Sequence, residues 1–166
     1  MINIKIVCVG KIKEQFYKDA ILEYTKRLSR FCKFEIVEVN EELIDPGLKN
    51  LDIVKQKEGE RILSKCEGYK IALAINGNNI SSEEHAKKIK ELGVSGSSHI
   101  TYIIGGSYGL SDEVLKNVDY KLSFGKLTYP HQLMRVVLTE QIYRAFTIIE
   151  GSGYHKWLKK NIWKLL

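Results

Sequence analysis

The 166-residue sequence lacks the features that mark membrane-spanning, exported and metal-dependent proteins. No apolar run approaches the roughly 18–20 residues that a helix needs to cross a bilayer. The first residues have no basic leader and no small-residue cleavage site, so we expect a cytosolic protein that begins with a strand. Hydrophobic residues at 44% and charged residues at 28% are typical of one globular domain with a real core.

Cysteine and histidine are scarce and scattered. The cysteines form no Cys-x-x-Cys pair, and buried free thiols are a simpler interpretation than a catalytic thiol. They are Cys8, Cys32 and Cys66. The histidines have no metal-ligand spacing, so the sequence predicts no metal site. They are His85, His99, His131 and His155.

Positive charge is concentrated at the two ends of the chain. Residues 1–33 hold eight Lys/Arg against three Asp/Glu, and residues 154–166 hold four lysines and no acid. The overall net charge is only +6, so the middle is mildly acidic. This distribution favours a polyanion-binding surface, although scattered solvated lysines would give the same count.

Hydrophobic periodicity predicts strands that alternate with helices. We expect strands at 2–9, 34–39, 70–75, 99–104 and 120–124. We expect helices at 14–30 and 52–65, a helix capped by Ser81 or Ser82, a short helix from Ser111 to Lys116, and a long helix after Pro130. In the first helix, Phe16 belongs to the apolar stripe. Such alternation predicts an α/β fold with a mostly parallel sheet and helices on both faces.

The long helix after Pro130 is apolar over most of its circumference. One tight stripe runs through Met134, Leu138, Ile142, Ala145 and Ile149, and further apolar residues lie outside it. A helix of this kind needs burial on two sides. In so small a domain the second covering surface is most simply another subunit, so we expect a homodimer.

Two glycine-containing loops could contact a ligand. The first, at 105–109, follows a strand and precedes a helix, yet it matches neither Gly-x-Gly-x-x-Gly nor a phosphate-binding loop. A diphosphate cofactor is therefore not expected, and a simple tight turn remains an alternative. In the second loop, at 123–131, Gly125 permits unusual backbone angles and Thr128 could bind a ligand or cap the next helix.

A series of short motifs spans nearly the whole chain. They are Val9-Gly10-Lys11, Glu58-Gly59, Ile104-Gly105-Gly106 to Leu110, Leu122-Ser123 to Pro130-His131, Arg135-Val136, Glu140-Gln141 to Arg144-Ala145 and Tyr154-His155-Lys156. Their order resembles the ribosomal large-subunit methyltransferase H family of the SPOUT superfamily, whose members contain a trefoil knot.

The resemblance implies a single SPOUT domain over 1–156 with a C-terminal knot, which binds S-adenosylmethionine. Its implied cofactor-binding residues are Leu73, Gly105, Phe124, Gly125, Lys126, Leu127, Thr128 and Tyr129. Gly125 stands where a member of the family has Ser, a change that backbone contacts should tolerate. The chain also continues past the family's usual end as a basic, amphipathic extension at 157–166. This extension could contact RNA, dock on the partner subunit or shield the site.

The family's substrate is a pseudouridine in helix 69 of 23S ribosomal RNA, methylated at N3 in the assembled ribosome. His155 is the candidate base because histidine titrates near neutrality. Tyr154 could orient or stack on the target base, and Arg144 or Lys156 could hold phosphate or the developing anion. The structural alternatives are a surface tail for 154–156 and an i,i+4 pair of Arg144 with Glu140. Two rival functions are a SPOUT enzyme acting on transfer RNA and a non-catalytic ribosome assembly factor.

Overall fold

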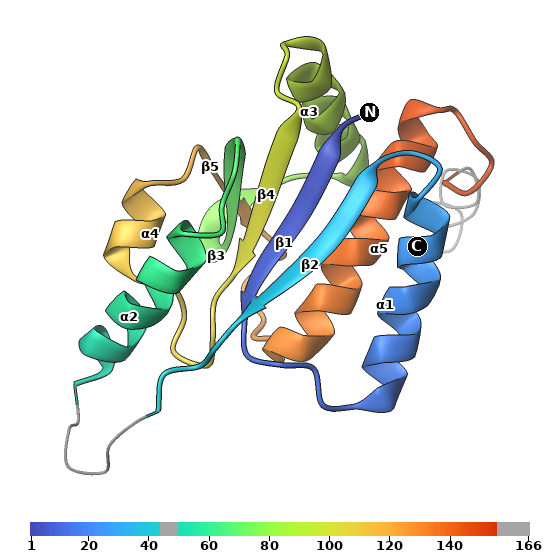
Figure 1. The fold of residues 1–166 in the computed structure, drawn as a ribbon. Helices are drawn as coiled ribbons and strands as arrows, with labels where there is room; N and C mark the ends of the chain where they lie inside the picture. Colours follow the sequence, from blue (N-terminus) through green and yellow to red (C-terminus); the bar gives the residue numbers. More distant parts are fainter. Residues whose placement is uncertain (44–49, 156–166) are drawn as a thin grey trace.

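Strands and helices alternate along the chain in the computed structural model, which describes residues 1–43 and 50–155 (Figure 1). In chain order the elements are β1 (Asn3–Val9), α1 (Gln15–Leu28), β2 (Lys33–Val39), α2 (Leu51–Leu63), β3 (Tyr69–Asn79), α3 (Ser82–Val94), β4 (His99–Ile104), α4 (Asp112–Lys116), β5 (Tyr120–Ser123) and α5 (His131–Ile149). The predicted extension at 157–166 and the predicted site residue Lys156 lie outside the described residues.

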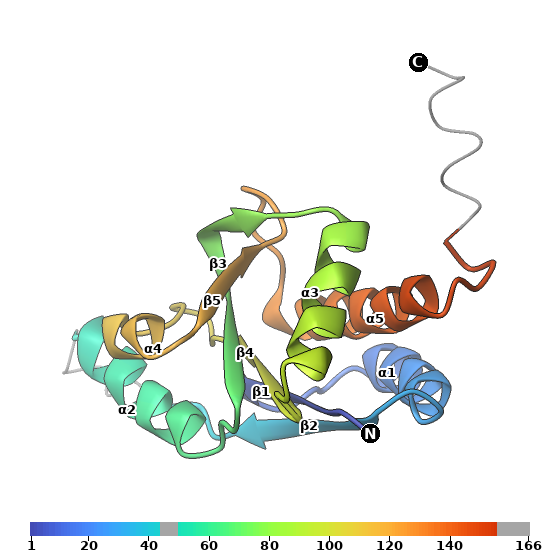
Figure 2. The same cartoon turned by 90° about the horizontal axis from the view of Figure 1, so that it is seen from above.

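The strands form one parallel sheet in the order β2-β1-β4-β3-β5. Seen from above, α2 and α4 cover one face of the sheet, and α1, α3 and α5 cover the other (Figure 2). The predicted α/β fold is therefore confirmed. Because all strands run the same way, their carboxyl ends meet at one edge, where open α/β sheets usually bind ligands.

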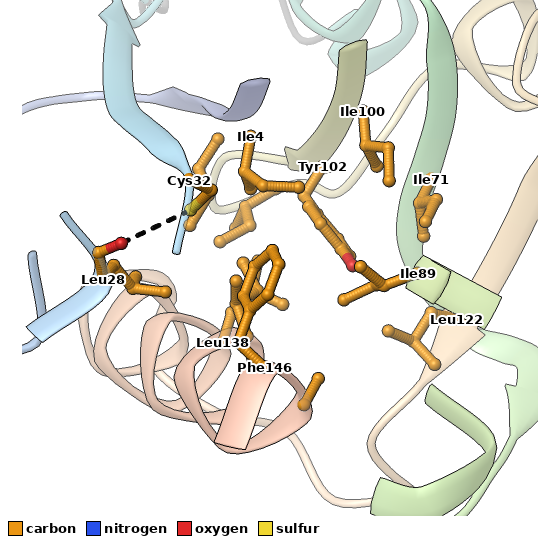
Figure 3. Close-up of a cluster of buried hydrophobic side chains, with 14 of the residues drawn as sticks. Ile4, Leu28, Cys32, Ile71, Ile89, Ile100, Tyr102, Leu122, Leu138 and Phe146 are labelled. Carbon is orange, nitrogen blue, oxygen red and sulfur yellow. Dashed lines mark hydrogen bonds between the residues drawn. The ribbon is translucent and has the colours of Figure 1, made fainter. Parts of the chain in front are cut away.

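Each face of the sheet has its own buried cluster. The larger one packs alternate residues of β1 and β4, such as Ile4 and Tyr102, against Leu138 and Phe146 of α5 (Figure 3). The smaller one packs the opposite face against α2 and α4. Since both faces are covered, β1 is buried without interruption from Ile6 to Val9 and β4 from Ile100 to Ile104, as is typical of parallel sheets.

Strand β3 is longer than predicted, which corrects the expectation that it ends near residue 75. Leu73 and Asn78 both pair with Leu122 of β5, so the residues between them bulge out of the ladder. A Cβ at Gly77 would lie 2.8 Å from the carbonyl carbon and oxygen of Lys121. Only glycine lets the two strands come so close here, and a polar Asn-Gly-Asn-Asn segment looks like a turn in the sequence alone.

The predicted helix caps of α3 and α4 are confirmed. The Ser81 side chain accepts a hydrogen bond from the Glu84 backbone N–H, and the Glu84 carboxylate accepts from that of Ser81. Ser111 accepts in the same way from the Val114 N–H at the start of α4. Both helix starts are thus fixed by side chains that local sequence identifies.

Helices α1 and α5 lie side by side and keep apolar surface outside the core (Figure 1). In α1, Phe16 is 62% exposed and Leu22 is 54% exposed, so the expectation that Phe16 belongs to a buried stripe is wrong. In α5 the predicted stripe is buried at Met134, Leu138, Ile142 and Ala145, while its flanks are only partly covered. No helix within residues 1–43 and 50–155 is long and apolar enough to cross a membrane.

Candidate active site

A cavity of about 340 Å³ lies at the carboxyl ends of β3, β4 and β5. Its walls come from the β3 bulge, the glycine loop after β4, the loop after β5 and the start of α5. The lining residues are Leu73, Ala74, Ile75, Ile104, Gly105, Gly106, Gly109, Leu110, Leu115, Leu122, Phe124, Gly125, Leu127, Thr128, Tyr129, His131 and Met134. Acidic residues, lysine and arginine are all missing from this set.

The first glycine loop is folded back on itself. Gly109 donates its backbone N–H to the Gly106 carbonyl at 3.0 Å and has a positive φ of 80°. A Cβ at Gly105 would lie 2.9 Å from the Gly109 carbonyl carbon. The loop at 105–109 is therefore a tight turn, as the alternative interpretation predicts. The same turn also forms one wall of the cavity.

The second loop is held by Ser123 at the end of β5. Its hydroxyl donates to the Ile75 carbonyl at 3.0 Å and accepts from the Gly125 N–H at 3.1 Å. Gly125 has a φ of 101°, in the region that favours glycine. Pro130 precedes α5 without a side-chain cap, so Thr128 does not cap this helix and instead lines the cavity.

The structure brings together nearly all the cofactor residues that the family resemblance implies. All of them line the cavity except Lys126, whose side chain is exposed. Sequence reasoning missed Ile75 because the bulge was not foreseen. It also missed His131 and Met134, which were assigned to the helix start and the core stripe. Burial and the nearby Arg135 lower the pKa of His131, which favours a neutral ring beside the cavity.

A second cluster of polar side chains lies at the other end of α5. Arg144 donates to the Glu140 carboxylate at 2.6 Å, as the i,i+4 alternative predicts. The Tyr154 hydroxyl donates to the same carboxylate at 3.1 Å. His155 lies between two elements, with Nδ1 3.4 Å from Arg144 Nη1 and Nε2 2.9 Å from Glu83 Oε1.

This cluster, defined as Glu83, Glu140, Arg144, Tyr154 and His155, is partly shielded from solvent. The Arg144 and Glu140 side chains are only 16% and 17% exposed. Burial and the neighbouring Glu140 carboxylate raise the pKa of Tyr154, so its phenol stays protonated and acts as a donor. The hydrogen bond from His155 lowers the pKa of Glu83, which keeps that carboxylate ionised.

The remaining titratable candidates do not join either site. Burial raises the pKa of Cys8 to about 11, that of Cys32 to about 12 and that of Cys66 to about 11, so these thiols are protonated at neutral pH. Such thiols are poor nucleophiles. His85 is buried, its Nε2 lies 2.7 Å from the Tyr102 hydroxyl, and burial lowers its pKa to about 4. Within the described ranges, no three His, Cys, Asp or Glu residues could hold a metal ion together.

Comparison with known proteins agrees with this architecture. A family model described as a predicted SPOUT methyltransferase matches residues 2–155. A solved probable methylase family protein from Haemophilus influenzae superposes with a TM-score of 0.57 at 16% identity, covering 93% of this chain and 70% of that one. That likeness concerns the fold alone. The fold and the matched family place the chain in the SPOUT class of methyltransferases.

Relatives of high identity define its place within the class. A ribosomal RNA large subunit methyltransferase H from Latilactobacillus sakei is 58% identical over 158 residues, which cover 93% of this chain and 99% of the relative. One from Clostridioides difficile is 54% identical with the same coverage. The chain therefore belongs to the ribosomal RNA large subunit methyltransferase H family, as the sequence motifs predict.

Proposed function

We propose that this protein uses S-adenosylmethionine to methylate 23S ribosomal RNA, at N3 of a pseudouridine in helix 69 of the assembled ribosome. The observation that carries the proposal is the cavity at the carboxyl ends of β3, β4 and β5, built by seven of the eight cofactor residues that the family motifs imply. The names of the relatives support ribosomal RNA as the substrate. The position and the atom rest on the family resemblance.

The cavity suits this cofactor better than a nucleotide diphosphate. Its walls are aliphatic and aromatic side chains with backbone groups from two glycine loops. An adenine ring needs an apolar slot with backbone partners, whereas a diphosphate needs cationic or helix-terminal donors. The lining contains neither lysine nor arginine. When bound, the cofactor supplies an electrophilic methyl group, and the protein has to position the acceptor and remove its proton.

The polar cluster provides groups that position the acceptor and remove its proton. His155 is the base, Arg144 stabilises negative charge on the target ring or holds phosphate, and Tyr154 orients or stacks on the base. Tyr154 packs edge-on against Tyr143 with ring centroids 5.0 Å apart, and the Arg144 guanidinium lies 4.9 Å from the Tyr154 ring centroid. These contacts hold the phenol and the guanidinium in fixed orientations. Lys156 keeps its proposed role in phosphate or anion binding.

The cofactor cavity and the polar cluster lie at opposite ends of α5. The cavity contacts His131 and Met134, whereas Arg144 lies ten residues beyond Met134, or about 15 Å along a helix of 1.5 Å rise per residue. A methyl transfer needs the base and the cofactor in contact with one target ring. We therefore propose a homodimer in which the cluster of each subunit completes the cofactor cavity of the other.

Exposed apolar surface supports this dimer. Helices α1 and α5 pack against each other, the flanks of α5 are only partly covered, and Phe16 and Leu22 of α1 are more than half exposed. Exposed apolar side chains of this size on a small domain support an interface. The basic N-terminal helix is proposed to contact RNA phosphates, which gives binding that weakens steeply with salt.

Calorimetric titration tests the cofactor assignment. S-adenosylmethionine should bind at one site per chain, and binding should be unchanged in excess chelator. A non-catalytic assembly factor need not give binding heat, and loss of binding under chelation would contradict the metal-free site.

Mass mapping of 23S ribosomal RNA tests the substrate. Fragments that contain helix 69 should lack one methyl group on pseudouridine in a strain deleted for this protein, and the purified protein should restore it on ribosomes from that strain. Equal activity on protein-free transfer RNA would favour the transfer-RNA enzyme instead.

A further inference from the structure

The first turn of α3 is attached to α5 beside the polar cluster. Its capping box fixes the helix start through Ser81 and Glu84. The Ser82 hydroxyl donates to the Gln141 side-chain oxygen at 2.8 Å, which ties this turn to α5 next to Glu140. Glu83 is therefore presented to the cluster from a fixed position rather than from a loose loop.

Glu83 makes a direct contact with His155. The His155 Nε2 lies 2.9 Å from Glu83 Oε1, although 72 residues separate them in the chain. The hydrogen bond lowers the pKa of Glu83, so the carboxylate is ionised at neutral pH and can only accept. The proton of this hydrogen bond must therefore sit on Nε2. In a neutral imidazole the lone pair is then on Nδ1, which faces Arg144.

The two carboxylates of the cluster contact different groups. Glu140 accepts from Arg144 at 2.6 Å, from Tyr154 at 3.1 Å and from Gln141 at 2.8 Å. These donors use both of its oxygens. Glu83 is the carboxylate that contacts the His155 ring. His155 thus depends on α3, an element that the family motifs do not mark.

We propose that Glu83 is a positioning residue for His155, which it holds with Nε2 protonated so that Nδ1 takes the proton from the target base. This inference rests on the proposed function. In the step, the target base replaces Arg144 at Nδ1, the N3–H bond of the pseudouridine breaks and an Nδ1–H bond forms on His155. The freed electron pair on N3 attacks the methyl carbon, the S–CH₃ bond breaks, and the sulfur leaves as a neutral thioether. Glu83 stays ionised and balances the imidazolium.

Single-turnover kinetics on ribosomes from a deletion strain test this role through a double-mutant cycle. The rate should fall on the order of 10- to 100-fold in Glu83→Ala, with the KM for cofactor unchanged, because a displaced ring no longer aligns for proton transfer. Glu83→Gln, whose amide oxygen can still accept from Nε2, should lose less. In a His155→Ala background, Glu83→Ala should change nothing further.

Glu91→Ala is the matched control. It removes the same charge from an exposed position on α3, where Glu91 pairs with Lys87 at 3.8 Å, and it leaves the capping box intact, so the rate should be unchanged. An independent readout uses ¹⁵N-histidine NMR of the free protein. The His155 Nε2 proton should be visible and slowly exchanging in the wild type and in Glu91→Ala, and lost in Glu83→Ala.

The outcomes separate this inference from the proposed function. Equal losses from Glu83→Ala with and without His155 would overturn the positioning role, as would a full rate in Glu83→Ala when His155→Ala is slow. A full rate in His155→Ala would overturn the base assignment itself, and the positioning role with it.

Discussion

At the scale of single residues, Gly105 lies where a side chain would meet the far side of its own loop. A Cβ there would be 2.9 Å from the Gly109 carbonyl carbon and 3.1 Å from the Leu110 side chain. We expect Gly105→Ala to weaken S-adenosylmethionine binding at least 10-fold by opening the turn, and Gly105→Trp to abolish binding. Calorimetric titration measures both.

Gly93 provides the comparison for this substitution. It lies within α3, and a Cβ there would have 3.8 Å to its nearest neighbour, the Ile2 side chain. Gly93→Ala should therefore keep cofactor binding and stabilise the fold by up to about 1 kcal/mol through helix propensity. Unchanged binding in Gly105→Ala would show that the loop tolerates a methyl group and that the close approach is not needed.

Glu58 is a second residue whose environment leads to a prediction, here on how stability depends on pH. It is only 4% exposed, its Oε1 accepts from the Glu42 N–H at 3.0 Å, and its Oε2 has no hydrogen-bond partner. Burial raises the pKa of this carboxyl above 4.5. The folded state therefore binds the proton more tightly than the unfolded state, and stability falls as the pH rises from 4.5 through the folded pKa.

Replacing Glu58 by Gln keeps an acceptor for Glu42 and removes the charge. At pH 7–8 we expect Glu58→Gln to be more stable than the wild type by about 1 kcal/mol, or roughly 2–4 °C in melting temperature. The difference should shrink toward pH 4, where Glu58 is protonated in both states. Thermal unfolding across this pH range measures it, with Glu60→Gln on the exposed side of α2 as the control. A stability gain that is independent of pH would contradict the explanation.

At the scale of elements, the buried side chain of Arg135 links α5 to strands β1 and β2 of the sheet. The Arg135 side chain is fully buried, its Nη1 lies 3.0 Å from Glu38 Oε1, and its Nη2 donates to the Val9 carbonyl. Arg135→Ala would leave the Val9 carbonyl and the Glu38 carboxylate without this partner, and should cost about 3–5 kcal/mol of unfolding free energy. Denaturant unfolding measures this loss.

Arg27→Ala is the contrasting variant. Arg27 pairs with Glu23 on the exposed surface of α1, so its removal should change the unfolding free energy by less than about 0.5 kcal/mol. Comparable losses in both variants would show that burial does not set the cost of breaking these ion pairs.

Local sequence signals predict an element well when the contacts that define it lie close together in the chain. The capping serines of α3 and α4, the bounds of β4 and four of the five stripe residues of α5 are confirmed, while Ile149 is only partly buried. The β3 bulge was missed because it depends on contact with β5, 43 or more residues away. Phe16 was misassigned because periodicity identifies an apolar stripe but not what covers it.

At the scale of the whole molecule, the cavity residues come from distant parts of the sequence and meet at the carboxyl edge of the sheet. The polar cluster lies away from that edge, at the other end of α5. The family resemblance implies eight cofactor residues, and seven of them line the cavity. Glu83 was not predicted, because its contact with His155 spans 72 residues and has no local pattern. The knot stays a prediction, since it follows from the resemblance rather than from periodicity.

The separation between cavity and cluster leads to a test on mixed dimers. A heterodimer with Gly105→Trp in one chain and His155→Ala in the other keeps one intact composite site if the cluster serves the partner's cavity. About half of wild-type methylation should then remain. If each chain builds its own site, both sites are damaged and the heterodimer should be nearly inactive.

The reciprocal arrangement of the two substitutions reverses the expected activity. When both substitutions are placed in one chain and the partner chain is wild type, a shared site leaves one composite site without a cofactor and the other without its base. That heterodimer should be nearly inactive, with the residual rate reduced by the 10²–10⁴-fold typical of losing a general base. A site built within one chain would instead keep half of the activity. Differently tagged chains allow both heterodimers to be purified. The two arrangements must give opposite results under either model, because the two substitutions lie in different chains in one heterodimer and in the same chain in the other.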